Sequence, residues 1–159
     1  MTASLPVISD LRDRPEFAGT IADRVWQAWW REQGVALGEI EAMVTECMDG
    51  PDIPLSLVAH EGPDFYGCAH LIASDLDERP QYTPWVAAVW VEEKTRKSGL
   101  GTKLVLAAVE QGFWRGSDTV YLCAEPHLAP FYEKMGWRCI EEGARGSVSS
   151  RSRAERLFI

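Results

Sequence analysis

The sequence has little that would suit a secreted, membrane-spanning or metal-binding protein. Its longest apolar runs, such as residues 104–109, are far shorter than the about 20 residues that cross a bilayer. The first residues show no charged segment followed by an apolar stretch, as a secretory signal would. The four cysteines are scattered without Cys-x-x-Cys spacing, and three of them lie in apolar strand-like runs, which indicates buried free thiols there. We therefore expect a reduced, cytoplasmic protein with no metal site and no membrane association.

Lysine is also scarce, and its placement is uneven. Three of the four lysines (Lys94, Lys97 and Lys103) lie in the window 94–103 together with Arg96, and no acidic residue interrupts them. Residues 1–83 hold fifteen acids and five bases, a net of −10, whereas residues 84–159 hold nine acids and eleven bases, a net of +2. An acidic chain argues against nucleic acid as the main partner, because neutralisation of phosphates drives that binding. The local basic window favours a small, highly charged anion.

Internal repeats and low-complexity tracts are absent, so 159 residues predict one domain over 1–159. Apolar periodicity predicts an initial hairpin and then strands that alternate with helices. The expected strands cover 5–11, 55–60, 65–74, 85–91, 119–124, 137–142 and 156–159, and the expected helices cover 15–33, 38–48, 99–116 and 126–136. This order favours a mixed, twisted sheet with helices on both faces.

The basic window joins an apolar strand to a helix through Gly99 and Gly101. The first turn of a helix has backbone N–H groups without intrahelical partners, and its dipole favours an anion there. Glycine allows a ligand to approach the backbone closely. The spacing is neither GxxxxGK[ST] nor GxGxxG. Taken alone, the stretch is equally typical of a solvated basic helix start.

Two motifs in combination are more specific. Arg96-x-x-Gly99-x-Gly101 resembles the [RQ]-x-x-G-x-[GA] signature of the GNAT-type N-acetyltransferases. "APFYEKMGWRCIE" (129–141) resembles the second hallmark of that superfamily: an aromatic pair, a short helix, and Gly-aromatic opening the next strand. The resemblance implies an α/β (α+β) fold: a mixed, mostly antiparallel twisted sheet of about six to seven strands, flanked by about four helices.

The resemblance also implies acetyl-CoA as cosubstrate and a location for it. Its pyrophosphate would lie on the backbone N–H groups around Lys97 to Thr102, and its pantetheine arm along a bulged fourth strand. The bulge itself is not visible in the sequence. The cofactor-binding residues implied are Val89, Trp90, Val91, Arg96, Lys97, Ser98, Gly99, Leu100, Gly101 and Thr102.

The implied reaction is direct attack of an amine on the thioester. Tyr132 matches the family's general acid for the departing thiolate, with aromatic packing beside Phe131 as the alternative. A backbone N–H of Val89 or Val91 would stabilise the oxyanion. The proton acceptor stays open among Glu92, Glu125, His127 and water. His60 and His70, in the predicted hairpin, are interpreted as packing or surface residues.

The acceptor is a primary amine of a small molecule or peptide, and its identity stays open. The tryptophans of "VWQAWW" (25–30) could form walls of its site or pack in the core. The acidic first half favours a cationic amine, whereas the arginines of 145–156 favour an acidic one. A non-catalytic acyl-CoA-binding or regulatory module is the alternative function, because the fourth strand contains no carboxylate. Dimers are common in the superfamily, so a homodimer is compatible with the resemblance.

Overall fold

A computed structural model describes residues 6–75, 80–123, 126–139 and 155–158. In these residues a mixed sheet has the strand order β1-β2-β3-β4-β5-β7-β6. The strands are β1 (Val7–Asp10), β2 (Leu55–Glu61), β3 (Asp64–Ile72), β4 (Trp85–Val91), β5 (Thr119–Leu122), β6 (Arg138–Cys139) and β7 (Glu155–Phe158). Neighbours among β1 to β4 pair antiparallel and form the longest ladders, whereas β4–β5, β5–β7 and β6–β7 are parallel.

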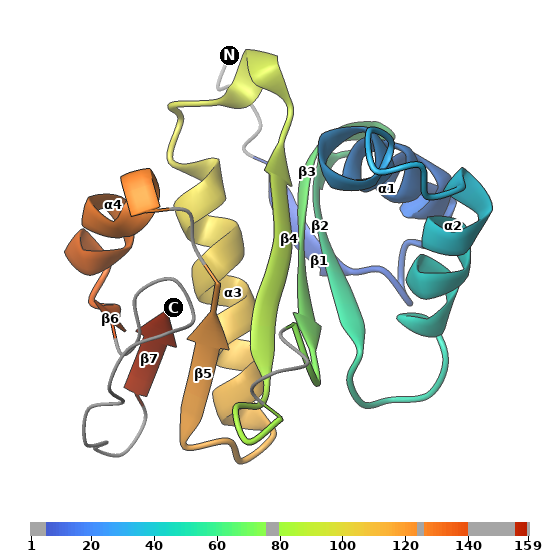
Figure 1. The fold of residues 1–159 in the computed structure, drawn as a ribbon. Coiled ribbons are helices and arrows are strands. Elements are labelled where there is room, and N and C mark those ends of the chain that lie inside the picture. The colour runs from blue at the N-terminus through green and yellow to red at the C-terminus, as the bar shows by residue number, and fades with distance from the viewer. Residues whose placement is uncertain (1–5, 76–79, 124–125, 140–154, 159) are drawn as a thin grey trace.

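Helices cover both faces of the sheet (Figure 1). The α-helices are α1 (Ala18–Val25), α2 (Leu37–Glu46), α3 (Leu100–Trp114) and α4 (Ala129–Lys134). Short turns extend or precede them: η1 (Pro15–Phe17), η2 (Trp26–Trp30, π-helical), η3 (Glu93–Thr95) and η4 (Pro126–Leu128). Helices α1 and α2 lie on one face, and α3 and α4 on the other. None of the helices in the described part of the chain has the length and apolarity to span a bilayer.

The α3 face of the sheet is a packed aliphatic core. Leu104, Val105 and Ala108 of α3 are buried against Leu71 of β3 and Val120 of β5. The approach is close, because a Cβ on Gly112 would lie 2.8 Å from Cγ2 of Val120. Alternation along the strands supplies this face with every second side chain. The hydrophobic effect therefore fixes α3, and with it the start of that helix, against the middle of the sheet.

The α1–α2 face is less uniformly apolar. Ile21 of α1 and Val44 of α2 pack with Val58 and Cys68 of the hairpin β2–β3. The same face also holds three buried polar residues, namely Ser56, His60 and His70. His60 is satisfied by Ser9 and by the carbonyl oxygen of Gly62, at 2.8 and 3.0 Å. His60 is thus a packing residue, as predicted.

The sequence-based expectations for the fold are confirmed in architecture and differ in detail. The mixed sheet with four flanking α-helices is present. The helix expected over 15–33 is divided, because the chain forms η1, α1 and the π-helical η2 in succession. Residues 140–142 of one expected strand, and the arginine-rich 145–154, lie outside the described residues.

Candidate active site

The sheet opens between β4 and β5. These parallel neighbours pair at Trp85–Tyr121 and Val86–Leu122 and nowhere else in the described residues. From Ala87 to Val91, strand β4 continues alongside α3, and no described residue pairs with it on that side (Figure 1). An unpaired strand edge offers backbone donors and acceptors to an extended ligand. Val89, Trp90 and Val91, which the sequence motif implicated, all lie on this open stretch.

A β-bulge lies where β4 leaves its partner. Cys68 pairs with Trp90 and His70 pairs with Ala87, so Ala88 and Val89 together oppose a single residue of β3. Ala88 has φ of 48°, an uncommon value for a residue with a side chain, which costs of order 1–3 kcal/mol. Contacts with the hairpin must hold this conformation. The bulge on the fourth strand, which the resemblance implied and the sequence did not reveal, is therefore present.

The basic loop forms an anion-binding geometry at the start of α3. The N–H groups of Thr95 and Arg96 are used within η3, and the first bond into α3 runs from Lys103 to the carbonyl oxygen of Gly99 at 3.1 Å. Between them, the N–H groups of Lys97 to Thr102 have no backbone acceptor in the described residues. Lys97 and Gly99 have φ of 67° and 85°. Such left-handed turns gather N–H groups into a concave surface that suits an anion.

Charged side chains fasten this loop to β4 and α1. The guanidinium of Arg96 lies 4.6 Å above the ring of Trp90, and its Nε donates to the carbonyl oxygen of Val91 at 2.9 Å. Arg24 of α1 donates to the carboxylate of Glu92 at 2.6 Å, and this hydrogen bond raises the pKa of Arg24. Glu92, one of the residues considered for the base, is thus engaged with Arg24 at the end of β4.

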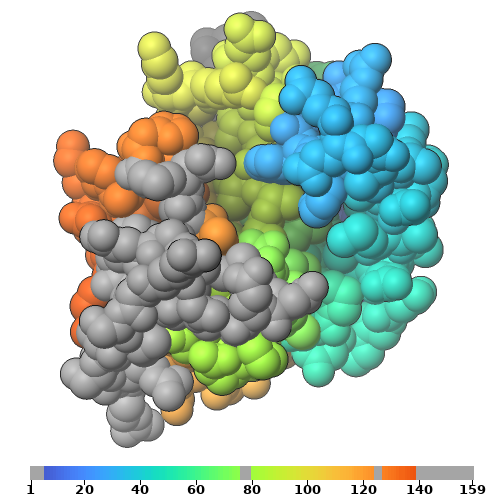
Figure 2. Space-filling model, viewed as in Figure 1, coloured from blue at the N-terminus to red at the C-terminus, as the bar shows by residue number. Residues whose placement is uncertain are grey.

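A cavity of about 820 Å³ extends from the α1–α2 face through the opening between β4 and β5. Figure 2 shows β4 at the bottom of a hollow, with α1 and η2 on one side and α4 on the other. Its walls are mainly apolar, with Trp29, Ile40 and Met43 from the helices and Ile72 from β3. On the far side it reaches Leu122, Cys123 and Tyr132. The open strand edge is therefore accessible from both faces of the sheet.

Tyr132 lies where the cavity meets the α3 face. The residue is 8% exposed, belongs to the aliphatic core cluster, and also lines the cavity. Phe131 and Trp137 pack edge-on against its ring. Burial raises the pKa of its hydroxyl, which keeps the phenol protonated at neutral pH. Packing and acid chemistry, weighed as alternatives for Tyr132, are thus compatible.

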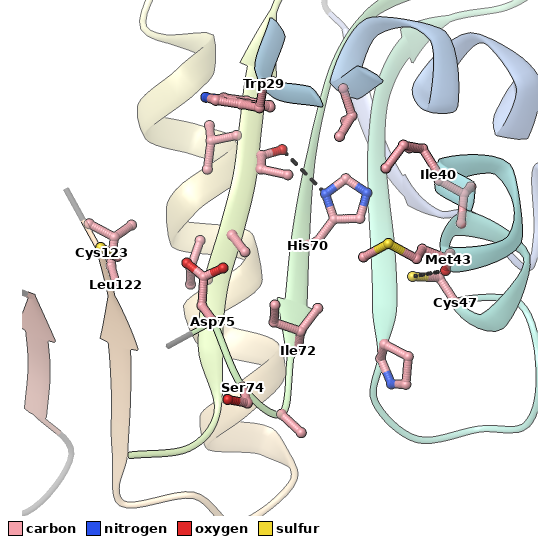
Figure 3. A pocket seen from close by; sticks show the side chains of 18 of the residues that line it. Trp29, Ile40, Met43, Cys47, His70, Ile72, Ser74, Asp75, Leu122 and Cys123 are labelled. Carbon is pink, nitrogen blue, oxygen red and sulfur yellow. Dashed lines mark hydrogen bonds between the residues drawn. The ribbon is translucent and has the colours of Figure 1, made fainter. Parts of the chain in front are cut away.

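His70, which the sequence-based interpretation treated as a packing or surface residue, lines the cavity. It is 6% exposed and lines the cavity beside the bulge. Its Nδ1 lies 3.2 Å from the carbonyl oxygen of Ala88 (Figure 3). Burial lowers the pKa of the imidazole to about 4, so the ring is neutral at pH 7. The available signal was its shared strand face with Cys68 and Ile72, which makes it a polar residue in an otherwise apolar row.

Of the other residues considered from the sequence, some line the cavity and others do not. Trp29 and Trp30 line the cavity, whereas Trp26 donates to the carbonyl oxygen of Val35 at 2.7 Å and packs on the core. His127 is exposed in η4 and is not among the residues that line the cavity. Glu125 lies outside the described residues. Within the described residues, no group of three His, Cys, Asp or Glu side chains could hold a metal ion.

Comparison with known proteins agrees with this geometry. The family model described as "Acetyltransferase (GNAT) domain" matches residues 54–139, more than half of the chain, and the protein therefore belongs to the GNAT acetyltransferase family. The match includes the open strand, the basic loop and Tyr132. A comparison with curated protein sequences finds no significant match.

Solved structures share the fold at low sequence identity. Glucosamine-6-phosphate N-acetyltransferase from Arabidopsis thaliana is 18% identical, with a TM-score of 0.64 over 94% of this chain and 98% of that one. An acetyltransferase of Trypanosoma brucei is 20% identical, with a TM-score of 0.65 over 88% and 97%. The Escherichia coli GNAT family N-acetyltransferase YhbS, solved in complex with CoA, is 19% identical, with a TM-score of 0.61 over 93% and 81%.

Proposed function

We propose that the protein is an acetyl-CoA-dependent N-acetyltransferase that transfers acetyl to a primary amine by direct attack in a ternary complex. The observation that supports this most is the coincidence of three features: the bulge at Ala88, and, within the described residues, a β4 edge without pairs beyond Val86 and N–H groups without backbone acceptors at the start of α3. They form one continuous surface that suits an extended pantetheine chain ending in a diphosphate.

The residues present fit such a cosubstrate, which supplies an acetyl group activated as a thioester. The N–H groups of Lys97 to Thr102 would hold the diphosphate, with Arg96 and Lys97 adding positive charge. Val89, Trp90 and Val91 would pair with the pantetheine arm through their backbone. An N–H group at the bulge, that of Val89, would stabilise the oxyanion, and one such donor contributes about 3 kcal/mol to transition-state binding.

Tyr132 is the proposed general acid. Tyr132 lines the cavity together with Leu122 and Cys123, and the sulfur of the cosubstrate would lie beside it. The departing thiolate takes a proton from it as the bond between carbon and sulfur breaks. The hydroxyl must be protonated to act in this way, and its raised pKa ensures that over the neutral range.

Calorimetry with acetyl-CoA, followed by detection of free CoA thiol in the presence of an amine panel, tests the proposal. Binding of acetyl-CoA together with amine-dependent CoA release is the expected result. Absence of binding at millimolar acetyl-CoA would overturn the assignment. Tight binding without turnover on any amine would indicate a non-catalytic acyl-CoA-binding module.

A further inference from the structure

The part of the cavity between α1–α2 and the sheet has a distinctive lining. Trp29, Ile40, Met43 and Ile72 surround it with apolar surface (Figure 3). Trp29 also packs edge-on against Trp90 of β4, with 6.5 Å between ring centroids. A wall of this kind gains free energy by covering an apolar ligand body, at roughly 25 cal/mol per Å² buried. This space therefore favours an acceptor with a hydrophobic body over a fully polar one.

The charges that line the cavity have one sign. Glu46 at the end of α2 and Asp75 beyond β3 are carboxylates, and no lysine or arginine is among the described lining residues. Desolvation raises the pKa of Asp75, although its side chain is exposed. An acceptor that arrives as an ammonium ion is attracted by such a lining, whereas one that carries its own carboxylate is repelled.

His70 presents a single hydrogen-bond acceptor to this space. Because the carbonyl oxygen of Ala88 can only accept, the Nδ1 atom of the neutral imidazole carries the proton and donates it. The Nε2 atom is then unprotonated, and its lone pair can accept a hydrogen bond. Figure 3 shows this second nitrogen turned away from Ala88, toward the side of the cavity where Ile40 and Met43 lie. Both backbone groups that hydrogen-bond to the imidazole, those of Ala88 and Ala87, belong to β4.

We propose that this subsite takes a primary amine carried on an apolar body and lacking a carboxylate, with the amine nitrogen hydrogen-bonded to Nε2 of His70, which takes its proton during acetyl transfer. This inference rests on the proposed function and specifies its acceptor and its base. Ala88 links the two parts of the site, since the same residue forms the bulge and orients the imidazole.

The proton inventory of the step balances. The acceptor first loses its ammonium proton to water, because only the neutral amine is a nucleophile. The amine nitrogen then bonds to the thioester carbonyl carbon, the bond from that carbon to sulfur breaks, and the thiolate takes the proton of Tyr132. The nitrogen becomes strongly acidic once its bond to carbon has formed, so a weakly basic imidazole suffices to accept its proton at that point. His70 then releases the proton to water, and Tyr132 is reprotonated from water. The other titratable residues that line the cavity are Glu46 at the end of α2, Cys47 just after it, Asp75 beyond β3, Cys123 and Tyr132.

The class of acceptor is tested with three amines that differ in one feature each. 2-Phenylethylamine has an apolar body and one amine, phenylalanine adds a carboxylate at the α-carbon, and 1,4-diaminobutane replaces the ring with a second charge. We expect kcat/KM for 2-phenylethylamine to exceed that of each of the others by about tenfold or more, as one favourable apolar contact or one removed charge repulsion provides. A preference for phenylalanine or the diamine would overturn the acceptor class and leave the proposed function standing. No acetyl-CoA binding at all would overturn the proposed function instead.

A positive charge introduced at Met43 tests whether the negative lining selects the acceptor, in a variant that is expected to fold. Its side chain lines the cavity and is 54% exposed, so Met43→Lys places an ammonium at the wall without disturbing the core. The ratio of kcat/KM for 2-phenylethylamine to that for phenylalanine should fall by about tenfold, while Met43→Gln, the uncharged control, should change it much less. An unchanged ratio in Met43→Lys would show that acceptors bind elsewhere.

The role of Nε2 is tested by two substitutions that mimic different halves of the ring. His70→Asn places an amide N–H near Nδ1 and can keep the bond to Ala88, but has nothing at Nε2. His70→Gln reaches the Nε2 position. We expect both variants to lower kcat with 2-phenylethylamine at least a hundredfold without changing the Kd of acetyl-CoA, because neither amide can take a proton. His70→Gln should keep a lower KM for the amine than His70→Asn, because its amide oxygen can still accept a hydrogen bond. Full kcat in His70→Asn would overturn the assignment. If His70→Asn does not fold, the Met43 pair still tests the subsite, and His70→Gln still tests the base.

Discussion

The two faces of the sheet are built for different purposes. The α3 face is an aliphatic core in which Leu104, Ala108 and Val120 are fully buried. The α1–α2 face has fewer apolar contacts, three buried polar residues and most of the cavity. The residues that stabilise the fold and the residues that line most of the cavity therefore lie on opposite faces of the same sheet. Strand β4 has side chains on both faces. Packing against α3 on one face can stabilise the strand while the backbone of Ala88 keeps its unfavourable φ in the bulge beside the cavity.

Tyr132 belongs to the core cluster and also lines the cavity, so removing its hydroxyl separates its packing from its chemistry. Tyr132→Phe keeps the ring that packs against Phe131 and Trp137, so the free energy of unfolding should hardly change. Loss of a general acid typically lowers the rate by about 10²–10⁴-fold. We expect a decrease of kcat in that range with an unaltered Kd for acetyl-CoA, measured with chemistry rate-limiting. Unchanged kcat would leave Tyr132 with a packing role alone.

The α3 face should respond in the opposite way, through stability. Leu104→Ala removes a fully buried side chain from the middle of the core, which typically costs about 2–5 kcal/mol of unfolding free energy. Leu106→Ala, in the same helix at 37% exposure, is the matched control and should cost under about 1 kcal/mol. Urea denaturation measures both. Equal losses would mean that the α3 face is not the packed core described above.

Much of the site was predictable from local sequence, and the rest required tertiary structure. Gly99, Gly101 and Tyr132 belong to short motifs whose geometry is set by adjacent residues, so their positions follow from the sequence. The bulge at Ala88 depends on pairing with a strand about twenty residues earlier, and "WVAAVW" contains no glycine or proline to mark it. Strand β4 therefore looked like a regular buried strand.

The place of His70 in the cavity wall was not predictable for a related reason. Alternation along β3 shows that it shares a face with Cys68, but it does not show that α2 leaves a cavity over that face. Its Nδ1 lies within hydrogen-bond distance of the carbonyl oxygen of Ala88, the residue that has a positive φ in the bulge. The tryptophans of 25–30 were ambiguous because the π-helical turn η2 breaks the 3.6-residue period that assigns faces. In each case the missing information was a distant contact.

Acid should weaken the α1–α2 face selectively, through His70. The native pKa of about 4 lies below the ordinary value of 6.5, so the unfolded chain binds a proton at a higher pH than the folded one. The stability is therefore complete above pH 6.5 and is lost as the pH falls toward 4, by up to about 3 kcal/mol. Denaturation midpoints of the wild type and His70→Asn at pH 7.5 and 4.5 measure this. The variant should lose less stability than the wild type, and parallel losses would contradict the buried neutral imidazole.

Gly101 directly follows the anion-binding loop, and substitutions there should have the smallest effect of those considered. It lies in the first turn of α3, and a Cβ there would contact Cγ2 of Val91 at 3.6 Å, an ordinary distance. Gly101→Ala should therefore fold normally, and its helix propensity adds up to about 1 kcal/mol of stability.

Gly101→Leu extends further into the space between the helix start and the open edge of β4. Losing one hydrogen bond to a charged phosphate costs about 1.5–3 kcal/mol, so we expect the calorimetric Kd of acetyl-CoA to rise by about tenfold or more in Gly101→Leu. Gly101→Ala should bind nearly as well as the wild type. An unaltered Kd in Gly101→Leu would mean that the diphosphate does not bind at this loop, because the substitution is confined to the first turn of α3.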